Sequence, residues 1–355
     1  MEHPILRLQK ELTAGEGFLI ESPANRRYLT GFPSSAGLVV ITKEQSVFLT
    51  DFRYYEKAAG VVNSCKVKML TSYKQDVLPL LKEFGVTTLY LETDFVSLQS
   101  FDRLTELMEG IHLSQSGRLT ELLVQMRSIK TTEEIAKIKQ AQAMTDETFS
   151  YILQRIEAGR TEIDVMLDME FYMRKLGSEG VAFDFVVVSG KNSSLPHGVP
   201  TEKVIEPGDF LTMDFGAVVD GYRSDMTRTV AVGRVTDQQR KVYETVLKAK
   251  KQSMMAIRPD VMCKDIDKIA RDIIDNEGYK GCFGHGLGHS VGLDIHENPS
   301  FNTRCETLLV PGMVITVEPG IYLENQFGVR VEDMIVVTET GCENLTHSPD
   351  ELVMI

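Results

Sequence analysis

Tryptophan is absent from this sequence, cysteine is scarce, and long apolar runs are missing. The five cysteines are odd in number and show no CxxC spacing, which is typical of free thiols in a reducing cytosol rather than of a disulfide scaffold. No apolar stretch approaches the ~20 residues that a helix needs to cross a bilayer. The N-terminal segment carries charges every few positions, unlike a signal peptide. We therefore expect a cytoplasmic protein with no membrane partner.

Basic residues are also in deficit, with 38 Lys and Arg against 51 Asp and Glu and a net charge of −13. A nucleic-acid-binding protein needs a basic face to neutralise phosphates, so this balance argues against a nucleic-acid partner. The remaining composition, 43% apolar and 25% charged, is that of an ordinary globular protein. A chain of 355 residues is long enough for two domains, each with its own core.

The N-terminal third alternates short apolar runs, bounded by polar residues, with stretches of helical spacing, which predicts a small α/β domain. The strand-like runs are 17–20, 37–41, 46–49 and 88–91, and the helical stretches are 73–84 and 97–108. A further helix is expected next, followed by a long helix with Thr131 as its N-cap and Glu134 completing a capping box. The expected domains are 1–118 and 131–355, joined by a linker helix at 119–130.

The second domain contains a weak internal repeat. Gly208 and Gly312 each follow a proline, and each is followed six positions later by an acid at the end of an apolar strand, Asp214 and Glu318. The offset is 104 residues in both cases, since 318 − 214 = 104 and 312 − 208 = 104. Two similar halves that each present a carboxylate could build one site on a pseudo-twofold axis.

Asp214 and Asp225 flank an Asp220-Gly221 pair, which is a strong β-hairpin signal. If residues 220–221 form the turn, Asp214 lies opposite Thr227 and diagonal to Asp225. If the turn lies one residue earlier, Asp214 faces Asp225 directly. Both registers place the two acids on one face of the hairpin, where a cation would offset their repulsion. The alternative is a pair of exposed strand acids beside arginines.

Glu318 ends an apolar strand before a Pro-Gly turn, and Glu332 lies in a strand-like run in which alternation puts it on the same face as Arg330. An apolar strand rarely ends in an acid that has no partner. The alternative is a structural ion pair between Arg330 and Glu332.

Three of the seven histidines, His285, His289 and His296, lie in or beside a glycine-rich run that should be loop or strand with close backbone approach. One of them can be a metal ligand. The others suit proton transfer, because the unperturbed pKa of histidine is near neutrality. His197, in a Pro-His-Gly sequence, is a fourth and weaker candidate.

Together these residues form a donor set of four carboxylates and one imidazole: Asp214, Asp225, His289, Glu318 and Glu332. Hard oxygen donors around one nitrogen donor suit two divalent ions bridged by carboxylates and do not suit a Cys/His zinc finger. The usual reason for a two-metal site is the activation of a water for hydrolysis.

In this order and spacing the motifs resemble the metallopeptidase family with the "pita-bread" fold that contains methionine aminopeptidase, aminopeptidase P, prolidase and creatinase. The motifs that carry the resemblance are 195–198 (LPHG), 213–216 (MDFG), 224–229 (SDMTRT), 285–289 (HGLGH), 296–297 (HE), 318–320 (EPG) and 328–333 (GVRVED). The first domain resembles the creatinase-type N-terminal domain of Xaa-Pro peptidases through 25–32 and 51–54. The resemblance implies an α/β (α+β) protein whose catalytic domain has pseudo-twofold halves.

Carried over by position, the resemblance makes Asp214 a ligand of the first metal, and Asp225 and Glu332 bridging ligands. His289 and Glu318 would bind the second metal. The metals would be two divalent ions, usually Mn²⁺ or Co²⁺.

The remaining family positions carry substrate roles. His197 and His285 would contact substrate and stabilise the transition state. His296 would assist proton transfer, and Arg330 would lie near the bridging glutamate. A homodimer is also implied.

The implied activity is hydrolysis of the Xaa-Pro bond at a peptide's N-terminus or in Xaa-Pro dipeptides, by a hydroxide shared between the two metals. A proline-containing peptide is thus the expected substrate. The alternatives are a creatinase-like hydrolase, a methionine aminopeptidase and a non-catalytic peptide-binding protein on the same fold. A dipeptidase must hold the free carboxylate of proline, and Arg304 is the only arginine between His296 and Pro311. The choice between aminopeptidase and dipeptidase stays open.

Overall fold

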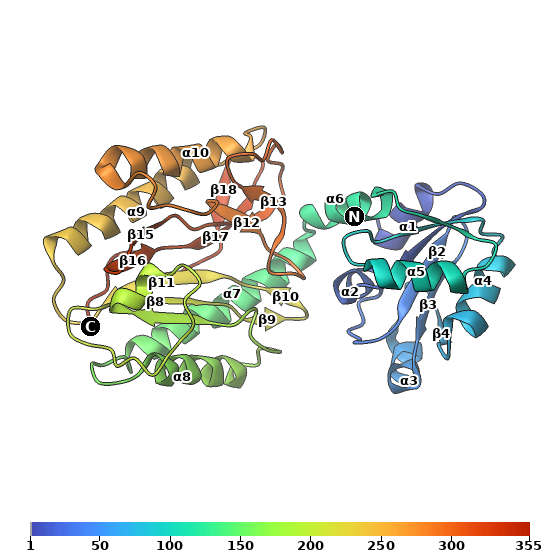
Figure 1. Ribbon diagram of the computed structural model, residues 1–355, viewed down its shortest axis with the longest axis horizontal. Helices are drawn as coiled ribbons and strands as arrows, with labels where there is room; N and C mark the ends of the chain where they lie inside the picture. Colours follow the sequence, from blue (N-terminus) through green and yellow to red (C-terminus); the bar gives the residue numbers. More distant parts are fainter. Residues whose placement is uncertain (1) are drawn as a thin grey trace. The chain divides into compact units, whose positions relative to one another are not determined.

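The computed structural model describes residues 2–355, which form two compact units divided between Arg127 and Ser128 (Figure 1). Each unit has its own buried cores: two in the first unit and two in the second. Among residues 2–355, no helix has the length and apolar character needed to cross a membrane.

The first unit is built on a six-stranded sheet with the order β4-β3-β2-β1-β5-β6. The strands are β1 (Glu16–Ile20), β2 (Leu38–Thr42), β3 (Ser46–Thr50), β4 (Lys66–Met69), β5 (Thr88–Leu91) and β6 (His112–Ser114). Pairing is antiparallel between β1 and β2 and between β2 and β3, and parallel elsewhere. Alternate residues of β1 face opposite sides, because Phe18 and Ile20 belong to one core and Leu19 to the other.

Helices cover both faces of this sheet. They are α1 (Pro4–Lys10), α2 (Pro23–Thr30), α3 (Phe52–Val61), α4 (Leu78–Glu83), α5 (Leu98–Leu107) and α6 (Arg118–Ser128). The last of them, α6, occupies the stretch for which a linker helix was expected. Its Leu119, Leu123 and Met126 are buried in the same core as Phe18, so α6 packs as part of the first unit.

The first half of the second unit contains α7 (Thr132–Leu153), α8 (Glu162–Lys175) and a three-stranded sheet with the order β11-β8-β7. The strands are β7 (Val186–Ser189), β8 (Phe210–Phe215) and β11 (Met226–Ala231). The predicted capping box is confirmed: Thr131 Oγ1 accepts from the Glu134 backbone N–H, and the Glu134 carboxylate accepts from the Thr131 N–H.

The second half repeats this plan with α9 (Asp237–Ala256), α10 (Cys263–Ile274) and a five-stranded sheet with the order β13-β12-β14-β17-β18. Its strands are β12 (Gly288–Ser290), β13 (Glu297–Phe301), β14 (Val314–Val317), β17 (Asp333–Val337) and β18 (Cys342–Asn344). A hairpin of β15 (Gly320–Leu323) and β16 (Phe327–Arg330) connects β14 to β17.

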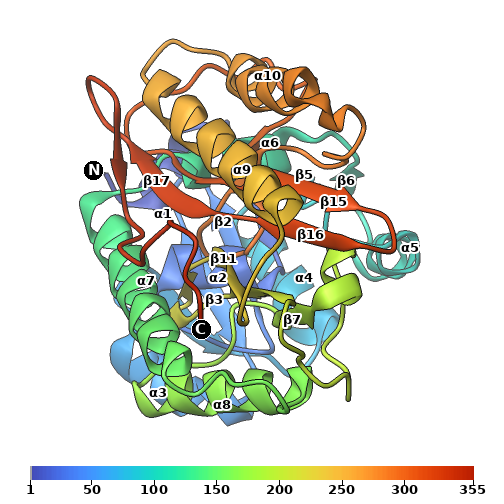
Figure 2. The same ribbon diagram turned by 90° about the vertical axis from the view of Figure 1, so that its left-hand side faces the viewer.

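Within the second unit the strands lie between two helical layers, α7 and α8 on one side and α9 and α10 on the other (Figure 1). Figure 2 shows α9 crossing over β15, β16 and β17. The two halves meet where the hairpin of β8 and β11 lies beside the hairpin of β15 and β16. There the Glu332 backbone N–H donates to the Thr227 carbonyl at 3.1 Å. The mixed α/β fold class with two similar halves is confirmed, and this seam is where the candidate site lies.

Candidate metal centre

The second unit contains a cavity of about 450 Å³, which is lined by residues from both of its halves. All nine residues expected to be metal ligands or catalytic residues line it: His197, Asp214, Asp225, His285, His289, His296, Glu318, Arg330 and Glu332. The structure therefore brings together side chains from both halves of the repeat and from the glycine-rich run.

The β8–β11 hairpin adopts the first of the two registers considered. Asp220 and Gly221 have left-handed φ angles of 47° and 80°, as a tight hairpin turn requires. Asp214 pairs directly with Thr227, which puts Asp225 at the diagonal position. Asp214 and Asp225 thus lie on one face of the hairpin, and that face lines the cavity.

His289 lies on β12, whose backbone runs unusually close to β14. A Cβ on the preceding Gly288 would lie 1.9 Å from the Thr316 carbonyl oxygen, so only glycine fits there. The Nδ1 of His289 is 3.2 Å from the Ser290 carbonyl, which can only accept a hydrogen bond, so Nδ1 carries the proton. The Nε2 lone pair is left facing the cavity, 3.5 Å from oxygens of both Asp225 and Glu318.

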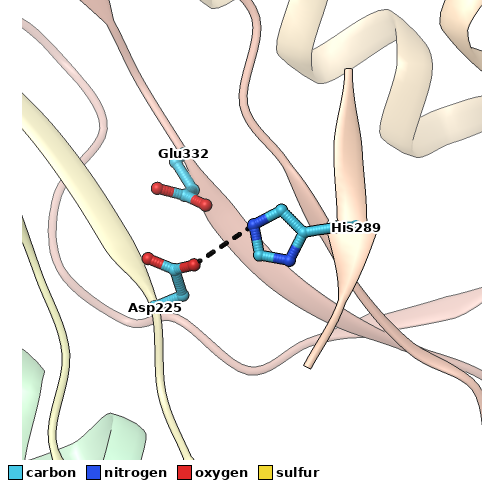
Figure 3. Close-up of side chains that lie close together, drawn as sticks. All are labelled: Asp225, His289 and Glu332. Carbon is cyan, nitrogen blue, oxygen red and sulfur yellow. Dashed lines mark ion pairs between the residues drawn. The ribbon is translucent and has the colours of Figure 1, made fainter. Parts of the chain in front are cut away.

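Figure 3 shows Asp225, His289 and Glu332 pointing toward one another from three different segments. One ligand atom from each lies within 4.8 Å of the other two, a spacing that one cation could span. The carboxylate of Glu332 is oriented by a hydrogen bond of 2.7 Å from Thr227 Oγ1. Such outer partners hold metal-binding carboxylates in place.

Without a cation, the negative charges of neighbouring carboxylates in this site repel one another. Burial raises the pKa of Asp225 and of Glu318 well above the ordinary range, and the neighbouring Glu332 carboxylate raises both further. Burial, together with Asp214, raises the pKa of Glu332 to about 8. A divalent cation would offset this repulsion and let Asp225, Glu318 and Glu332 ionise together.

Arg330 is the buried cation of the site, and its partner is Asp214 rather than Glu332. Its Nη2 lies 2.7 Å from Asp214 Oδ2, and its Nε donates to Thr227 Oγ1 at 2.9 Å. Its Nη1 donates to the Tyr322 hydroxyl at 2.9 Å and to the Pro196 carbonyl at 3.2 Å. The alternative of a structural Arg330–Glu332 pair is therefore wrong.

The other alternative, a pair of exposed strand acids beside arginines, is wrong as well, because Asp225 is buried and Asp214 is only partly exposed. Arg228 forms its ion pair with Asp333, at 2.7 Å. The guanidinium of Arg223 donates to the carbonyls of Ala182 and Leu293. The two acids of the β8–β11 hairpin have other partners: Asp214 pairs with Arg330, and Asp225 lies 3.5 Å from His289.

Two histidines beside the acids have pKa values below the ordinary range, mainly because burial disfavours the imidazolium. The pKa of His285 falls to about 4, and that of His296 also falls. His285 Nδ1 lies 2.8 Å from the Gly286 carbonyl, so its Nε2, 3.0 Å from the Tyr322 hydroxyl, accepts. The His296 ring packs edge-on against His289 with centroids 4.4 Å apart. His197 also lines the cavity, and its side chain is exposed.

A buried carboxylate oxygen with no hydrogen-bond partner indicates that the donor set fits a divalent cation. Among residues 2–355, few buried side-chain polar atoms lack a hydrogen-bond partner, and Asp214 Oδ1 is one of them. Arg330 satisfies the other oxygen of this carboxylate. A buried carboxylate oxygen with no donor is costly unless a cation coordinates it.

Sequence reasoning missed three residues of this neighbourhood. Tyr322 links Arg330 to His285, and no local signal distinguishes it from a core tyrosine. Thr227 bridges Arg330 and Glu332, and its position opposite Asp214 was the available signal. Glu162 supports the segment that carries His197. Arg304, considered as an anchor for a proline carboxylate, is exposed and is not among the cavity-lining residues.

Comparison with known protein families gives two matches that together cover most of the chain. Residues 136–339 match metallopeptidase family M24. Residues 5–129 match the creatinase/prolidase N-terminal domain. These matches confirm the resemblance drawn from the motifs.

Individual relatives are similar over nearly the whole chain. The Xaa-Pro dipeptidase of Pyrococcus furiosus is 36% identical over 336 residues, 94% of each chain. Among solved structures, the Xaa-Pro dipeptidase from Bacillus anthracis has a TM-score of 0.94 at 40% identity, covering 99% of this chain and 98% of the other. The X-Pro aminopeptidase from Thermotoga maritima has a TM-score of 0.91 at 35% identity, covering 98% and 100%.

Proposed function

Because this chain belongs to metallopeptidase family M24, we propose that it hydrolyses the peptide bond before proline at the N-terminus of peptides, using two divalent ions. The observation that carries the proposal is the convergence of four carboxylates and one imidazole on one cavity, with one carboxylate oxygen left unpaired. Asp214, Asp225, His289, Glu318 and Glu332 would hold the ions. Oxygen-rich donor sets of this kind suit Mn²⁺, which we expect to be the native metal, with Co²⁺ as a substitute.

When bound, the ions would supply Lewis acidity and lower the pKa of a coordinated water from 15.7 toward ~7. The residues around the ions would accept and donate the protons that the reaction moves. Glu318 suits the role of proton acceptor, because its side chain is 16% exposed and lines the cavity, whereas that of Asp225 is 6% exposed and Asp214 is already paired with Arg330. Thr316 Oγ1, 3.3 Å from Glu318 Oε1, keeps this carboxylate oriented.

The proline nitrogen must gain a proton before it can leave, and His296 is the residue proposed to relay it. Burial holds its pKa below the ordinary range, so a proton taken up by this imidazole is readily passed on. His285 would position the scissile carbonyl, because the Tyr322 hydroxyl fixes its ring. His197, exposed at the cavity, would contact the substrate chain.

The cavity lining favours peptides that continue beyond proline over Xaa-Pro dipeptides. A dipeptide exposes the proline carboxylate, which needs a free cation. Among the described residues that line the cavity, Arg330 is the only lysine or arginine, and its guanidinium is occupied by Asp214, Thr227 and Tyr322. We therefore propose aminopeptidase P-type activity as the main activity.

The test is to measure initial rates of protein stripped of metal and then refilled with Mn²⁺ or Co²⁺. The substrates are an Xaa-Pro dipeptide and the matching Xaa-Pro-Yaa tripeptide. We expect metal-dependent cleavage of the tripeptide, with a lower kcat/KM for the dipeptide. Cleavage of the dipeptide alone would make the protein a dipeptidase. Failure to cleave either substrate with any metal would point to a peptide-binding protein.

Two further properties belong to the same proposal. We propose a homodimer, to be tested by sedimentation of the purified protein. We also propose a cytoplasmic location, which the five free thiols support.

A further inference from the structure

Two cysteines of the second unit, Cys263 and Cys305, lie 42 positions apart in the sequence but on segments that adjoin in the fold. Cys263 is the first residue of α10, and Cys305 lies in the turn region between β13 and β14. The two segments are joined by backbone hydrogen bonds, from Cys263 N–H to the Thr307 carbonyl at 3.0 Å and from Lys264 N–H to the Cys305 carbonyl at 2.9 Å. These bonds bring the two cysteines onto adjoining stretches of backbone, and each thiol contributes to the pKa shift of the other.

The two sulfurs have different surroundings. Cys263 is fully buried, whereas Cys305 is half-buried beside the exposed Arg304 and Glu306. Burial raises the pKa of the Cys263 thiol far above its ordinary value. Burial also acts to raise the pKa of Cys305, but hydrogen bonds from Thr307, from the Ser300 backbone and from the Cys263 thiol outweigh it and leave that pKa lowered. Cys305 is thus the accessible nucleophile, and Cys263 is a protonated thiol on the adjoining segment.

We propose that Cys263 and Cys305 form an oxidation site that takes a peroxide and closes into a disulfide. The Cys305 thiolate attacks one peroxide oxygen, the O–O bond breaks, and a sulfenic acid and hydroxide are formed. The Cys263 sulfur then attacks the Cys305 sulfur, the S–O bond breaks, and water leaves. The two thiols lose two electrons, which the peroxide gains.

Closure of this disulfide would reach the cavity wall through a short chain of hydrogen bonds. The Cys305 backbone N–H donates to the Asn302 carbonyl at 3.3 Å, and Asn302 Nδ2 donates to Ser300 Oγ at 2.6 Å. Asn302 and Ser300 both line the cavity, and Ser300 pairs with His289 across the β12–β13 ladder. A covalent S–S bond is shorter than a thiol–thiol contact, so its formation displaces this segment. This consequence for activity rests on the proposed function, whereas the oxidation site itself does not.

The test treats the metal-free full-length protein with hydrogen peroxide, blocks the remaining thiols with N-ethylmaleimide and maps the peptides by mass spectrometry. We expect a linked peptide joining Cys263 to Cys305 that dithiothreitol removes. The three remaining cysteines should stay reduced over the same time: Cys65, Cys282 and Cys342. Formation of any other disulfide, or over-oxidation of Cys305 with no linked peptide, would overturn the proposal.

Variants separate the two roles. In Cys263→Ser, oxidation should stop at a sulfenic acid on Cys305, which dimedone traps. In Cys305→Ser, Cys263 should stay reduced. Cys282→Ser, which changes another half-buried thiol of the same unit, should still form the linked peptide. Dimedone labelling of Cys263 in the Cys305→Ser protein would reverse the assigned roles and contradict the proposal.

Activity is a separate readout. After refilling with Mn²⁺, the oxidised protein should lose cleavage of the tripeptide on the order of tenfold and recover it with dithiothreitol, because small displacements of substrate-positioning groups cost at least that much. Unchanged activity in a fully disulfide-linked protein would refute the link to the cavity. A protein that is inactive even when reduced would contradict the proposed function and leave the peptide map as the test of the oxidation site.

Discussion

Arg330 and Asp214 form a buried ion pair of 2.7 Å that joins the two halves of the catalytic unit. The two residues are 116 positions apart. The pair leaves one oxygen of Asp214 for a cation and uses the arginine fork to hold Thr227 and Tyr322 as well. A single guanidinium thereby orients Asp214, which is a proposed metal ligand. It also holds Thr227, which donates to Glu332, and Tyr322, which is hydrogen bonded to His285.

Replacement of Arg330 by lysine should impair catalysis strongly. A lysine ammonium cannot reproduce the planar fork that reaches four partners, so the Arg330→Lys protein should lose about 10–100-fold in kcat/KM or metal affinity. Kinetics and metal titration of the purified variant measure both quantities. Arg304→Lys, at an exposed position outside the cavity lining, is the matched control and should behave like the parent protein. Equal activity of the two variants would contradict the role given to Arg330.

Replacement of Asp225 by asparagine should abolish peptide cleavage. It should also lower the number of metal ions bound per protein chain, as measured by elemental mass spectrometry. The amide cannot supply the negative charge with which a carboxylate would bind a divalent cation. In the metal-free protein the same change should raise the melting temperature, because it removes one of the repelling buried carboxylates.

A control on the same hairpin isolates this effect. Asp220→Asn lies at the turn, where asparagine tolerates the left-handed backbone, and should leave activity and metal content intact. Full activity of the Asp225→Asn protein would refute the assignment of Asp225 as a ligand.

The stability of the metal-free protein should fall as the pH rises from ~7 to ~8, a range in which the buried His285 and His289 are neutral in both the folded and the unfolded state. Glu332 has a pKa of about 8 in the folded protein, against ~4.3 in an unfolded chain. Between these values the folded state holds the proton and the unfolded state does not, so rising pH favours unfolding. The contribution is fully present below the unfolded pKa and is lost through the folded pKa. Thermal melts at a series of pH values measure it.

Saturating Mn²⁺ should reverse this trend, since a cation stabilises the ionised carboxylates. The gain in melting temperature on adding metal should thus be larger at pH ~8 than at pH ~5. Glu332→Gln should flatten the slope of the metal-free protein. Between pH ~7 and ~8, a melting temperature of the metal-free protein that rises with pH would contradict the raised pKa of Glu332.

Glu162 should prove to be a positioning residue for the segment that carries His197. Its fully buried carboxylate accepts hydrogen bonds from Ser189 and Asn192 before His197 and from Thr201 after it. In Glu162→Gln, one carboxylate oxygen becomes an amide that cannot accept, which leaves buried donors unpaired. We expect the free energy of unfolding to fall by about 3 kcal/mol.

The catalytic consequence of the Glu162 change distinguishes positioning from simple stabilisation. At a temperature where the variant is fully folded, KM should rise more than kcat falls, because His197 is proposed to contact substrate. Glu157→Gln, at an exposed position just before α8, is the control for both measurements. Urea unfolding and steady-state kinetics provide the readouts, and an unchanged KM in the folded variant would argue for a purely structural role.

Much of the fold could be predicted where the signal is local. The four apolar strand runs and the capping box at Thr131 needed only periodicity and end chemistry. The edge strands β4 and β6 were missed, because β4 is short, charged and mostly exposed, as edge strands often are, and β6 has only three residues. The role of α6 in the core of the first unit was missed for a different reason, since helical spacing does not tell which surface a helix will pack against.

The sequence by itself determined the chemistry available to this protein. The order of four acids and one imidazole, the turn at Asp220-Gly221 and the glycine that lets β12 approach β14 all follow from residue type and local backbone preference. The tertiary structure alone decided which groups meet. Strand alternation placed Arg330 on the same face as Glu332, yet its partner is Asp214, because side-chain pairing across 116 residues depends on how two hairpins pack. The proximity of the segments that carry Cys263 and Cys305 arises in the same way, from packing of distant parts of the chain that no local pattern encodes.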